Sequence, residues 1–346
     1  MEQGLPKQRS YLSIWSLYQD EAPYMREWIE FHRLMGVERF FLYDHYSSDD
    51  HRAALAPYIE EGIVVHYDWP VDPGQAEATA HCLEHHRDDS RWIAFIDLDE
   101  FLFSPTGKKL PEVLAGYEQY PGVVVNVAVF GTSGHETPPD GLVIENYLER
   151  TDNPDVNGNK KSIVDPARVV RNRGGLWDFS EGESVNENMQ PADGRRDPSS
   201  VSFSRLRINH YHTRSAIEYE RKVAKPRADR RGVRMVARQM RERVLTGLNE
   251  VHDDTLAAYA PAVREALRQT EERWHERHGS PPPDVDGRDA ESQADALAVG
   301  FARDVLAGVA VCAADGKAYP HVDLVEKALR MLSPPDVTRP DATGPG

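Results

Sequence analysis

Short apolar runs alternate with amphipathic segments over the first third of the chain. The runs have the length and the β-branched and aromatic content typical of buried strands; they are Tyr11–Leu17, Val37–Tyr43, Ile63–Tyr67 and Trp92–Ile96. Between them, apolar side chains recur at helical spacing. This spacing predicts three helices: one that Asp20 caps and Gly36 ends, a second that Gly62 ends, and a third at Gln75–His86. Strands that alternate with helices in this way predict a parallel sheet with helices on both faces.

The pattern changes after Phe103. A helix is predicted at Leu110–Tyr120, and strands separated by Gly-rich or polar loops are predicted at Val123–Phe130, Leu142–Leu148, Ser162–Val170 and Val201–Ile208. This half is therefore expected to be mixed or antiparallel, and its long polar loop at Asn172–Pro198 is predicted to be a mobile lid. From Ser215 onward, charged helices are predicted at Val233–Leu248, Asp254–Arg268, Ala290–Leu306 and Val322–Leu332.

These elements predict an α/β protein with a C-terminal helical extension. The α/β domain is expected at residues 1–215, with one half at about 11–103 and the other at about 104–215. The helical extension is expected at 216–332, and the Pro-, Asp- and Gly-rich residues 333–346 are expected to be a disordered tail.

Two aspartates directly follow the last strand of the first half. Asp97 and Asp99 stand where the chain must leave the carboxyl edge of the sheet, which is where ligands of open α/β sheets bind. Residues two apart on a strand point the same way, so both carboxylates are expected to face one hard divalent cation, Mg²⁺ or Mn²⁺, that also holds substrate phosphates. A turn or a helix cap is the alternative explanation for Asp-x-Asp after a strand.

Composition narrows the class of protein and of partner. The chain has 346 residues, 40% hydrophobic and 28% charged, as in ordinary globular proteins, and a formal net charge of −16. This charge argues against binding nucleic acid or anionic membranes, because nothing would offset phosphate repulsion. The chain has only two cysteines and no apolar N-terminal segment, which predicts a cytoplasmic protein. It has no run of about 18 apolar residues, so no membrane span is expected. No Gly-x-Gly-x-x-Gly follows the first strand and no P-loop sequence occurs, which disfavours a dinucleotide-binding fold and a P-loop NTPase.

Several motifs occur in an order that resembles one group of enzymes. They are Gln19–Glu21 with Tyr24–Trp28, Phe41–His45 with Ser47 and Asp49, the Asp-x-Asp sequence Asp97–Phe101, Phe130–His135, Lys161–Val164, and Asn209–His212 with Arg214 and Ser215. Together, from about Tyr11 to about Tyr259, they resemble the glycosyltransferases of family 2 and family 92. The resemblance implies the GT-A fold, a Rossmann-like mixed sheet with a nucleotide-sugar half and an acceptor half, and transfer of a sugar from a nucleotide donor.

The resemblance also implies where a nucleotide-sugar would bind. The base and ribose of a UDP-sugar are expected at Tyr18, Asp20 and Asp44, although a turn cap would also explain Asp44. The candidates for binding its phosphates are Lys161, Arg214 and Lys222, of which Lys222 is also explained as a surface charge.

A metal site is implied next to these residues. Asp99 is expected to ligate Mn²⁺ or Mg²⁺ directly, and Asp97 to meet the ribose or a metal-bound water. Glu100 is expected to orient its neighbours. His210 is expected to complete the site, with His212 as the alternative, and an imidazole ligand favours Mn²⁺ over Mg²⁺.

The base that accepts the acceptor's proton stays open at this point. An inverting transfer needs a carboxylate on the face opposite the leaving group. Glu136 and Asp178 are the candidates, with Glu181 and Glu183 as alternatives. The segment Gly174–Phe179 departs from the family pattern, which expects a histidine there; its tryptophan and phenylalanine suit stacking on a sugar ring or core packing.

The predicted function is metal-dependent transfer of a sugar, with inversion, from a UDP-sugar to the hydroxyl of a saccharide or small-molecule acceptor. Two alternatives remain: a non-catalytic nucleotide-sugar or carbohydrate-binding protein of the same fold, and a metal-dependent phosphohydrolase. An aspartyl phosphatase is disfavoured, because its chemistry expects Thr or Val where Phe101 stands.

Overall fold

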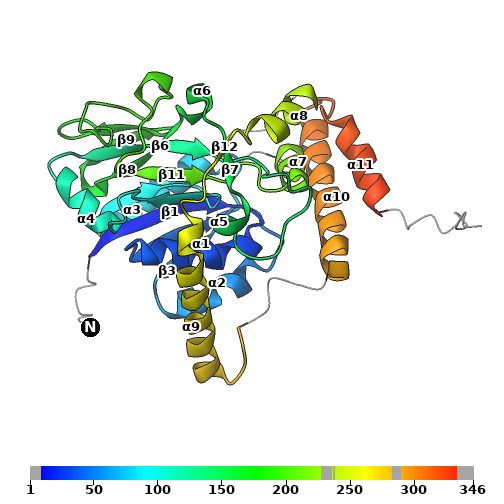
Figure 1. The fold of residues 1–346 in the computed structure, drawn as a ribbon, viewed down its shortest axis with the longest axis horizontal. Coiled ribbons are helices and arrows are strands. Elements are labelled where there is room, and N and C mark those ends of the chain that lie inside the picture. The colour runs from blue at the N-terminus through cyan, green and yellow to red at the C-terminus, as the bar shows by residue number, and fades with distance from the viewer. Residues whose placement is uncertain (1–8, 227–235, 237, 283–289, 333–346) are drawn as a thin grey trace, which may run out of the picture. The chain divides into compact units, whose positions relative to one another are not determined.

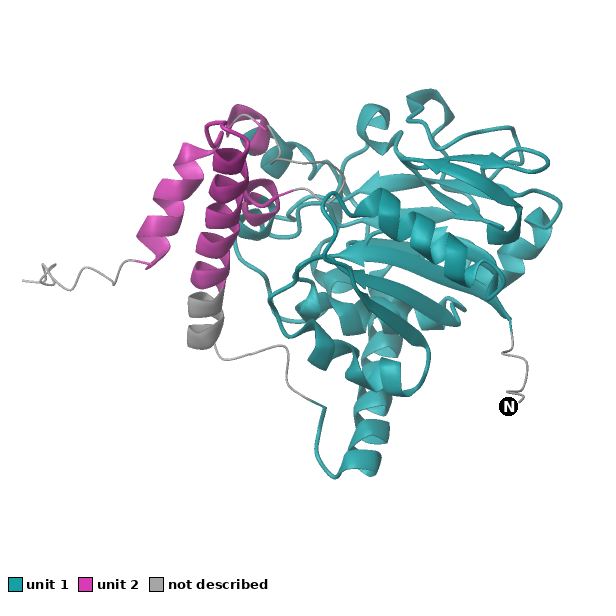
Figure 2. Cartoon of the chain, turned by 180° about the vertical axis from the view of Figure 1, so that it is seen from behind, with its two compact units in different colours: residues 1–219, 228–230, 242–286 teal, residues 220–227, 231–241, 287–346 magenta. Residues whose placement is uncertain are grey.

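The computed structural model describes residues 9–226, 236, 238–282 and 290–332. These residues form two compact units (Figure 2). The first contains the described residues up to Tyr219 together with 242–282, and the second contains 220–226, 236, 238–241 and 290–332. Residues 242–282, which the sequence pattern groups with the helical extension, thus belong to the first unit.

The first unit is built on an eight-stranded mixed sheet with the order β3-β2-β1-β4-β8-β6-β11-β5 (Figure 1). Its strands are β1 (Ser10–Tyr18), β2 (Arg39–Asp44), β3 (Val64–Asp68), β4 (Ser90–Phe95), β5 (Glu100–Phe103), β6 (Gly122–Val129), β8 (Lys160–Val164) and β11 (Arg207–His210). Strands β1 to β4 pair in parallel; β8 is antiparallel to β4 and β6, and β11 is parallel to β6 and antiparallel to β5. This confirms a parallel first half and a mixed second half.

Helices cover both faces of this sheet, as predicted. On one face, apolar side chains of α1 (Ala22–Leu34), α2 (His51–Glu60) and α9 (Ala260–His278) join the main core. On the other, α3 (Gln75–His86) and a hairpin of β9 (Val169–Arg173) and β10 (Leu176–Phe179) close a second core. Shorter elements connect these layers: α4 (Leu110–Leu114), α5 (Val143–Asn146), α6 (Pro154–Asn157), β7 (Glu149–Arg150) and β12 (Val251–His252).

The predicted strand at Leu142–Leu148 is wrong. The chain instead forms the helical turn α5, because the buried Glu27 carboxylate accepts hydrogen bonds from Val143 N at 2.8 Å and Ile144 N at 3.0 Å. Burial raises the pKa of Glu27 to about 7 in spite of these bonds. A short apolar run is compatible with a strand or a helix, and here a carboxylate from another helix satisfies the free N–H groups of a helical start.

The predicted strand at Val201–Ile208 is confirmed only at its end, where β11 begins at Arg207. The residues before it do not join the sheet, because the backbone N–H groups of 204–206 donate to the buried carboxylate of Glu187 at 2.7, 2.7 and 2.8 Å. A carboxylate that accepts several backbone donors replaces the hydrogen bonds that a neighbouring strand would supply.

The predicted strand at Ser162–Val170 is in fact two strands. The first, β8, ends before a 3₁₀ turn at Pro166–Arg168, where the Asp165 side chain accepts a backbone N–H at 3.2 Å. The second, β9, leaves the large sheet and pairs with β10, so that the loop predicted as a lid, Asn172–Pro198, contains a strand. Its mobility stays a prediction.

The predicted helices after the sheet differ mainly in length. The helix expected at Leu110–Tyr120 is α4 followed by a 3₁₀ turn. α8 (Arg238–Gly247) lies within the helix expected at Val233–Leu248, of which 233–235 and 237 fall outside the described residues. α9 starts later than expected, α10 (Ala290–Ala314) runs further, and α11 (Val322–Leu332) is confirmed.

The end of α1 is held by a neutral histidine and a glycine. The Nδ1 atom of buried His32 lies 2.8 Å from the carbonyl oxygen of Trp28, and its Nε2 accepts the Leu102 N–H at 3.0 Å. Burial lowers the pKa of His32 to about 3, so the imidazole is uncharged at neutral pH. Gly36 follows at φ +96°, where an added Cβ would lie 2.7 Å from the ring of Pro111.

The second unit contains the end of α7 (Ala216–Ala224), the start of α8, and α10 and α11 (Figure 2). Arg221 on α7 pairs with Asp304 on α10, with 2.8 Å between Nε and Oδ2. The stretch Leu297–Ala314 of α10 has a mean hydropathy of 1.8 and, among the described residues, is the one helix long and apolar enough to cross a membrane. In this structure 39% of it is buried within the protein.

Candidate functional site

The two aspartates lie in a turn between β4 and β5. β4 ends at Phe95, and the chain reverses so that Glu100 N donates to the carbonyl oxygen of Asp97 at 3.0 Å. The Glu100 carboxylate in turn accepts the Asp97 N–H at 3.0 Å. Asp97 and Asp99 are therefore not neighbours on one strand face, as the alternation argument assumed, and each meets a different basic side chain. We call residues 97–100 the acidic turn.

Asp97 meets a lysine from β8. Lys161 Nζ lies 2.6 Å from Asp97 Oδ2 and 3.1 Å from Glu100 Oε2. Burial raises the pKa of the Glu100 carboxyl, and Lys161 opposes that rise. Burial also lowers the pKa of Lys161, but the two carboxylates outweigh it, so the net shift is upward and the ammonium stays charged. Lys161 thus neutralises the inner side of the acidic turn.

Asp99 meets a histidine from β11. His210 pairs with Glu100 in the antiparallel register of β11 and β5, which places its ring beside the turn. His210 Nε2 lies 3.2 Å from Asp99 Oδ2, and Nδ1 lies 3.7 Å from Glu100 Oε1. The ring centroid of His212 lies 5.0 Å from that of His210. His210, the histidine preferred from the sequence, thus lies beside Asp99.

The chemistry of these donors fits a divalent cation. Asp99 and His210 offer a carboxylate oxygen and an imidazole nitrogen, and 11% and 18% of their side chains remain exposed. In the part of the chain that the structure describes, no three His, Cys, Asp or Glu side chains are grouped to hold a metal ion. The protein thus offers a partial set of ligands, as expected where substrate phosphates and water complete the shell.

Arg214 occupies a strained and buried position. Its backbone lies in the left-handed region at φ +49°, its Nη1 is 2.7 Å from Glu21 Oε2, and its guanidinium stacks 3.7 Å above the ring of Tyr24. Burial lowers its pKa, but Glu21 and Tyr24 outweigh this and the net shift is upward. Nε and Nη2 are buried without a hydrogen-bond partner among the described residues. A buried guanidinium with free donors is suited to an anionic ligand.

The carboxyl ends of β1 and β2 hold the residues predicted for base and ribose. Asp44 Oδ1 accepts the Ser47 N–H at 2.9 Å, and Asp20 Oδ1 accepts the Ser48 N–H at 2.8 Å. Both carboxylates therefore hold the loop after β2, which is the turn-capping role considered for Asp44. The remaining residue, Tyr18, lies at the end of β1 with 4% of its surface exposed.

Two histidines join this edge and were not singled out from the sequence. The Tyr18 hydroxyl lies 2.9 Å from His66 Nε2, and the rings of His66 and His51 stack with centroids 5.8 Å apart. His51 Nε2 is 3.7 Å from Asp44 Oδ2. His66 stands near the end of a predicted strand, so a search for polar residues at strand ends would have found it. His51 begins α2, well after the end of β2, and no such signal marks it.

The remaining candidate residues from the sequence are not part of the acidic turn. Lys222 is on the part of α7 that belongs to the second unit. Glu136 is exposed, and its carbonyl oxygen accepts the Ile217 N–H at 3.1 Å. Asp178 on β10 accepts a hydrogen bond from Arg173 Nη2 at 2.7 Å. Trp177, beside it, packs on Phe95 with ring centroids 4.6 Å apart, which favours core packing for this tryptophan.

The described residues thus define a mixed α/β protein with an acidic turn at the carboxyl edge of its sheet. The family model "Glycosyltransferase family 92" matches residues 10–244, and the chain belongs to this family. Family membership and the mixed sheet together confirm the predicted α/β, GT-A type of fold.

The similar curated proteins are from plants. A family 92 protein of Oryza sativa subsp. japonica is 33% identical over 159 residues, which is 45% of this chain and 27% of the rice protein. The galactan β-1,4-galactosyltransferase GALS3 of Arabidopsis thaliana is 31% identical over 215 residues, which is 57% of this chain and 40% of that protein. The matches therefore span well under half of these relatives.

Solved structures show a weaker likeness. Residues 1–349 of TarS from S. aureus in complex with UDP align with a TM-score of 0.35 and 10% identity, over 92% of this chain and 90% of that one. The glucosyl-3-phosphoglycerate synthase of Mycobacterium tuberculosis, solved with Mn²⁺ and UDP, aligns with a TM-score of 0.29 and 15% identity, over 46% of this chain and 58% of that one.

Proposed function

We propose that this protein is a metal-dependent glycosyltransferase that moves a sugar from a UDP-sugar to an acceptor hydroxyl, with inversion at the anomeric carbon. The observation that carries the proposal is the acidic turn at the carboxyl edge of the sheet, where Asp99 lies beside His210 of β11. Together with membership of glycosyltransferase family 92, this arrangement favours Asp97-Leu98-Asp99 as the Asp-x-Asp motif of a metal-dependent enzyme.

Asp99 and His210 are the residues that would hold the cation, and the imidazole favours Mn²⁺ over Mg²⁺. Bound there, the cation would act as a Lewis acid that stabilises the negative charge of the departing UDP. Asp97 has the secondary role of contacting the ribose or a metal-bound water, and its ion pair with Lys161 supports a fixed position for that contact. Lys161 then acts through Asp97 and Glu100 instead of clamping phosphate.

The rest of the donor would lie along the ends of β1 and β2. Tyr18, Asp20 and Asp44 would meet the base and ribose, and the unpartnered Nε and Nη2 of Arg214 would donate to the diphosphate. His51 stands between Tyr18 and Asp44 and would help to fix that end of the nucleotide. The overall negative charge of the chain makes these local cations necessary.

In the reaction, the acceptor hydroxyl oxygen forms the new bond to the anomeric carbon as the bond to the UDP oxygen breaks, and the electron pair leaves with UDP. The hydroxyl proton passes to a carboxylate on the face opposite UDP. Glu136 and Asp178 remain our candidates for this base. Asp178 can act as the base only when its ion pair with Arg173 opens as the acceptor binds. The side chains of Arg173 and Asp178 are 55% and 43% exposed, so this pair is weak enough to open.

The choice of donor for the first assay comes from the relatives. Because one relative is named a galactan β-1,4-galactosyltransferase, UDP-galactose is the first donor to test, followed by other UDP-sugars. The released product distinguishes the proposed function from its two alternatives. A glycosyltransferase releases UDP, whether the sugar passes to an acceptor or slowly to water. A phosphohydrolase releases inorganic phosphate, and a non-catalytic binding protein releases neither.

The direct test is ligand-induced stabilisation. UDP with Mn²⁺ is expected to raise the melting temperature of the wild type, because a ligand that binds only the folded state stabilises it. Asp99→Asn should abolish this rise, whereas the control Asp88→Asn, at an exposed position before the amino end of β4, should preserve it. An equal rise in Asp99→Asn, or a rise with UDP that does not depend on Mn²⁺, would contradict the proposal.

A further inference from the structure

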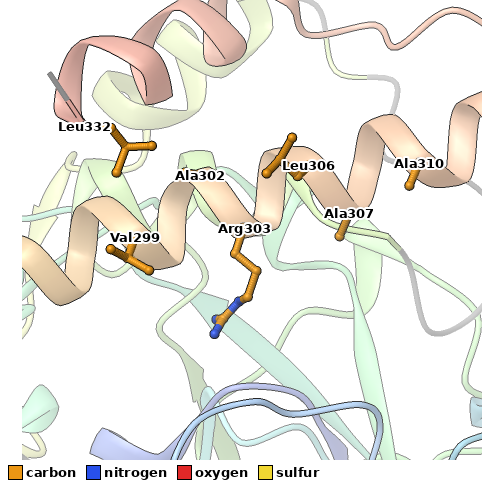
Figure 3. Close-up of a pocket in the computed structure, with 7 residues that line it drawn as sticks. All are labelled: Val299, Ala302, Arg303, Leu306, Ala307, Ala310 and Leu332. Carbon is orange, nitrogen blue, oxygen red and sulfur yellow. The ribbon is translucent and has the colours of Figure 1, made fainter.

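The second unit has an apolar groove of about 540 Å³ along α10, lined by Val299, Leu306 and Ala310 (Figure 3). Nothing among the described residues shows what covers it. The first unit contains a feature whose contacts indicate a role. The carboxylate of Glu218, near the start of α7, gathers four hydrogen-bond donors beside Arg214.

Glu218 connects three parts of the first unit. Its Oε2 accepts the Ser215 N–H at 3.0 Å and the Ser215 hydroxyl at 2.6 Å. The Tyr147 hydroxyl donates to the same oxygen at 3.3 Å, and the hydroxyl of Tyr24 on α1 donates to Oε1. Ser215 directly precedes α7 and Glu218 stands three residues later, which is the spacing of a capping box. The carboxylate is thus fixed at the start of its own helix and in turn fixes two tyrosines.

These contacts hold Arg214 at both ends. The guanidinium lies 3.7 Å above the ring of Tyr24, and the hydroxyl of that ring is held by Glu218. The backbone of Arg214 is at φ +49°, a left-handed conformation that is unfavourable for an arginine and persists only where its surroundings hold it. The next residue, Ser215, supplies such a hold, because its N–H and its hydroxyl both donate to Glu218. One carboxylate therefore restrains both the side chain and the backbone of this arginine.

The protonation states favour this arrangement. Burial and the Glu218 carboxylate raise the pKa of Tyr24 well above its usual value, so the phenol keeps its proton and donates a hydrogen bond to Glu218. Burial lowers the pKa of Arg214, but nearby groups outweigh it, and Asp99 of the acidic turn is one of them. Arg214 is therefore charged and lies within electrostatic reach of the acidic turn.

We propose that Glu218 is a positioning residue, which holds Arg214 through Tyr24 and Ser215 so that its guanidinium is already in place when the donor binds. The inference rests on the proposed function, in which the unpartnered Nε and Nη2 of Arg214 donate to the diphosphate. A long side chain loses rotamer freedom when a ligand immobilises it, and this loss weakens binding. An arginine that the protein has already fixed avoids most of that loss, so the benefit appears only for ligands that carry the diphosphate.

The test compares two ligands, UDP with Mn²⁺ by isothermal titration calorimetry and uridine by ligand-observed NMR. Tyr24→Phe removes the hydroxyl bound to Glu218 and should raise the dissociation constant of UDP with Mn²⁺ about tenfold, which is the effect of one hydrogen bond to a charged group. Uridine has no diphosphate, so its dissociation constant should stay within about twofold of the wild-type value. General damage to the fold would weaken both ligands to the same degree.

Two variants at the same carboxylate separate the route through Tyr24 from other effects. Tyr147→Phe is the matched control. It also removes a hydroxyl that donates to Glu218, but the ring that stacks on Arg214 is that of Tyr24, so the affinity for UDP should stay within about twofold. Glu218→Gln should weaken UDP binding at least as much as Tyr24→Phe, because an amide has one acceptor oxygen and cannot serve both Ser215 and Tyr24. Circular dichroism should show all these variants folded.

A double-mutant cycle with Arg214→Lys shows whether the effect passes through the arginine. Lysine lacks the planar guanidinium that stacks on the ring and donates from Nε and Nη2. In the Arg214→Lys background, Tyr24→Phe should therefore change the dissociation constant of UDP by less than about twofold, whereas independent contributions would multiply.

The proposal is wrong if Tyr24→Phe binds UDP as tightly as the wild type, if it weakens uridine to the same degree, or if its effect persists in Arg214→Lys. A loss in Tyr147→Phe as large as that in Tyr24→Phe would likewise exclude the route through the Tyr24 ring. In each of these cases the wild type binds UDP with Mn²⁺, so the proposed function stands and only the positioning role of Glu218 fails. A wild type that binds no UDP in the presence of Mn²⁺ would instead refute the proposed function, and this inference with it.

Discussion

Replacing Lys161 by methionine should destabilise the first unit, because it isolates a buried carboxylate. Methionine keeps the length of the side chain and removes the ammonium that lies 2.6 Å from Asp97 and 3.1 Å from Glu100. The two acids are affected differently. The Asp97 side chain is 42% exposed and can be hydrated, whereas that of Glu100 is 1% exposed and cannot.

The magnitude follows from this difference in exposure. Leaving one partner of a buried ion pair uncompensated costs about 3–5 kcal/mol. We use the lower end, about 3 kcal/mol, because burial already raises the pKa of Glu100, so that the carboxyl can take up a proton once Lys161 is removed. For a domain of this size that corresponds to a fall in melting temperature of about 6–12 °C.

The assay is urea denaturation of the wild type, Lys161→Met, Glu100→Gln and the double variant, which together form a double-mutant cycle. The double variant should recover most of the stability lost in Lys161→Met, because no unpaired charge then remains buried. A loss below about 1 kcal/mol in Lys161→Met, or a double variant no more stable than that single one, would refute the view that this lysine serves to balance Glu100.

Three further predictions concern the scaffold. Glu187→Gln should lower the free energy of unfolding in urea by about 3 kcal/mol, because an amide can accept only some of the backbone N–H groups that the carboxylate holds; a loss under about 1 kcal/mol would contradict this. The pKa of His32 is about 3 in the folded state and 6.5 ordinarily. Between these two values the folded state binds fewer protons than the unfolded state, so the free energy of unfolding falls as the pH drops below 6.5, by about 1.4 kcal/mol per pH unit. The stability difference between the wild type and His32→Gln should therefore shrink with that slope as the pH falls to about 4, and a constant difference would exclude it. Gly36→Ala should lower the free energy of unfolding, measured by thermal unfolding, by about 2–3 kcal/mol, because of its φ of +96° and the contact with Pro111. The control Gly62→Ala, at φ +74° with open space around it, should lower it less. Equal losses in the two variants would show that the contact with Pro111 contributes nothing.

Local pattern determined much of the first unit. The apolar runs of β1 to β4 alternate with amphipathic helices, and this alternation alone specifies a parallel sheet with both faces covered. It also placed Asp97 and Asp99 at the carboxyl edge of that sheet, since they directly follow a buried strand. The charge and the lack of glycine-rich phosphate loops also disfavoured whole classes of protein from composition and motif alone.

Tertiary structure decided whatever depends on contacts between distant residues. The segments 142–148 and 201–206 are not strands, because Glu27 and Glu187 capture their backbone N–H groups, and no local pattern indicates an acceptor from another part of the chain. The site shows the same dependence. Lys161 reaches Asp97 across 64 residues and His210 reaches Asp99 across 111. The sequence by itself determined which side chains are able to do chemistry. Only the packing of β8 and β11 beside the acidic turn decided that these side chains meet. The reason is that proximity across the sheet is set by strand order and not by distance along the chain.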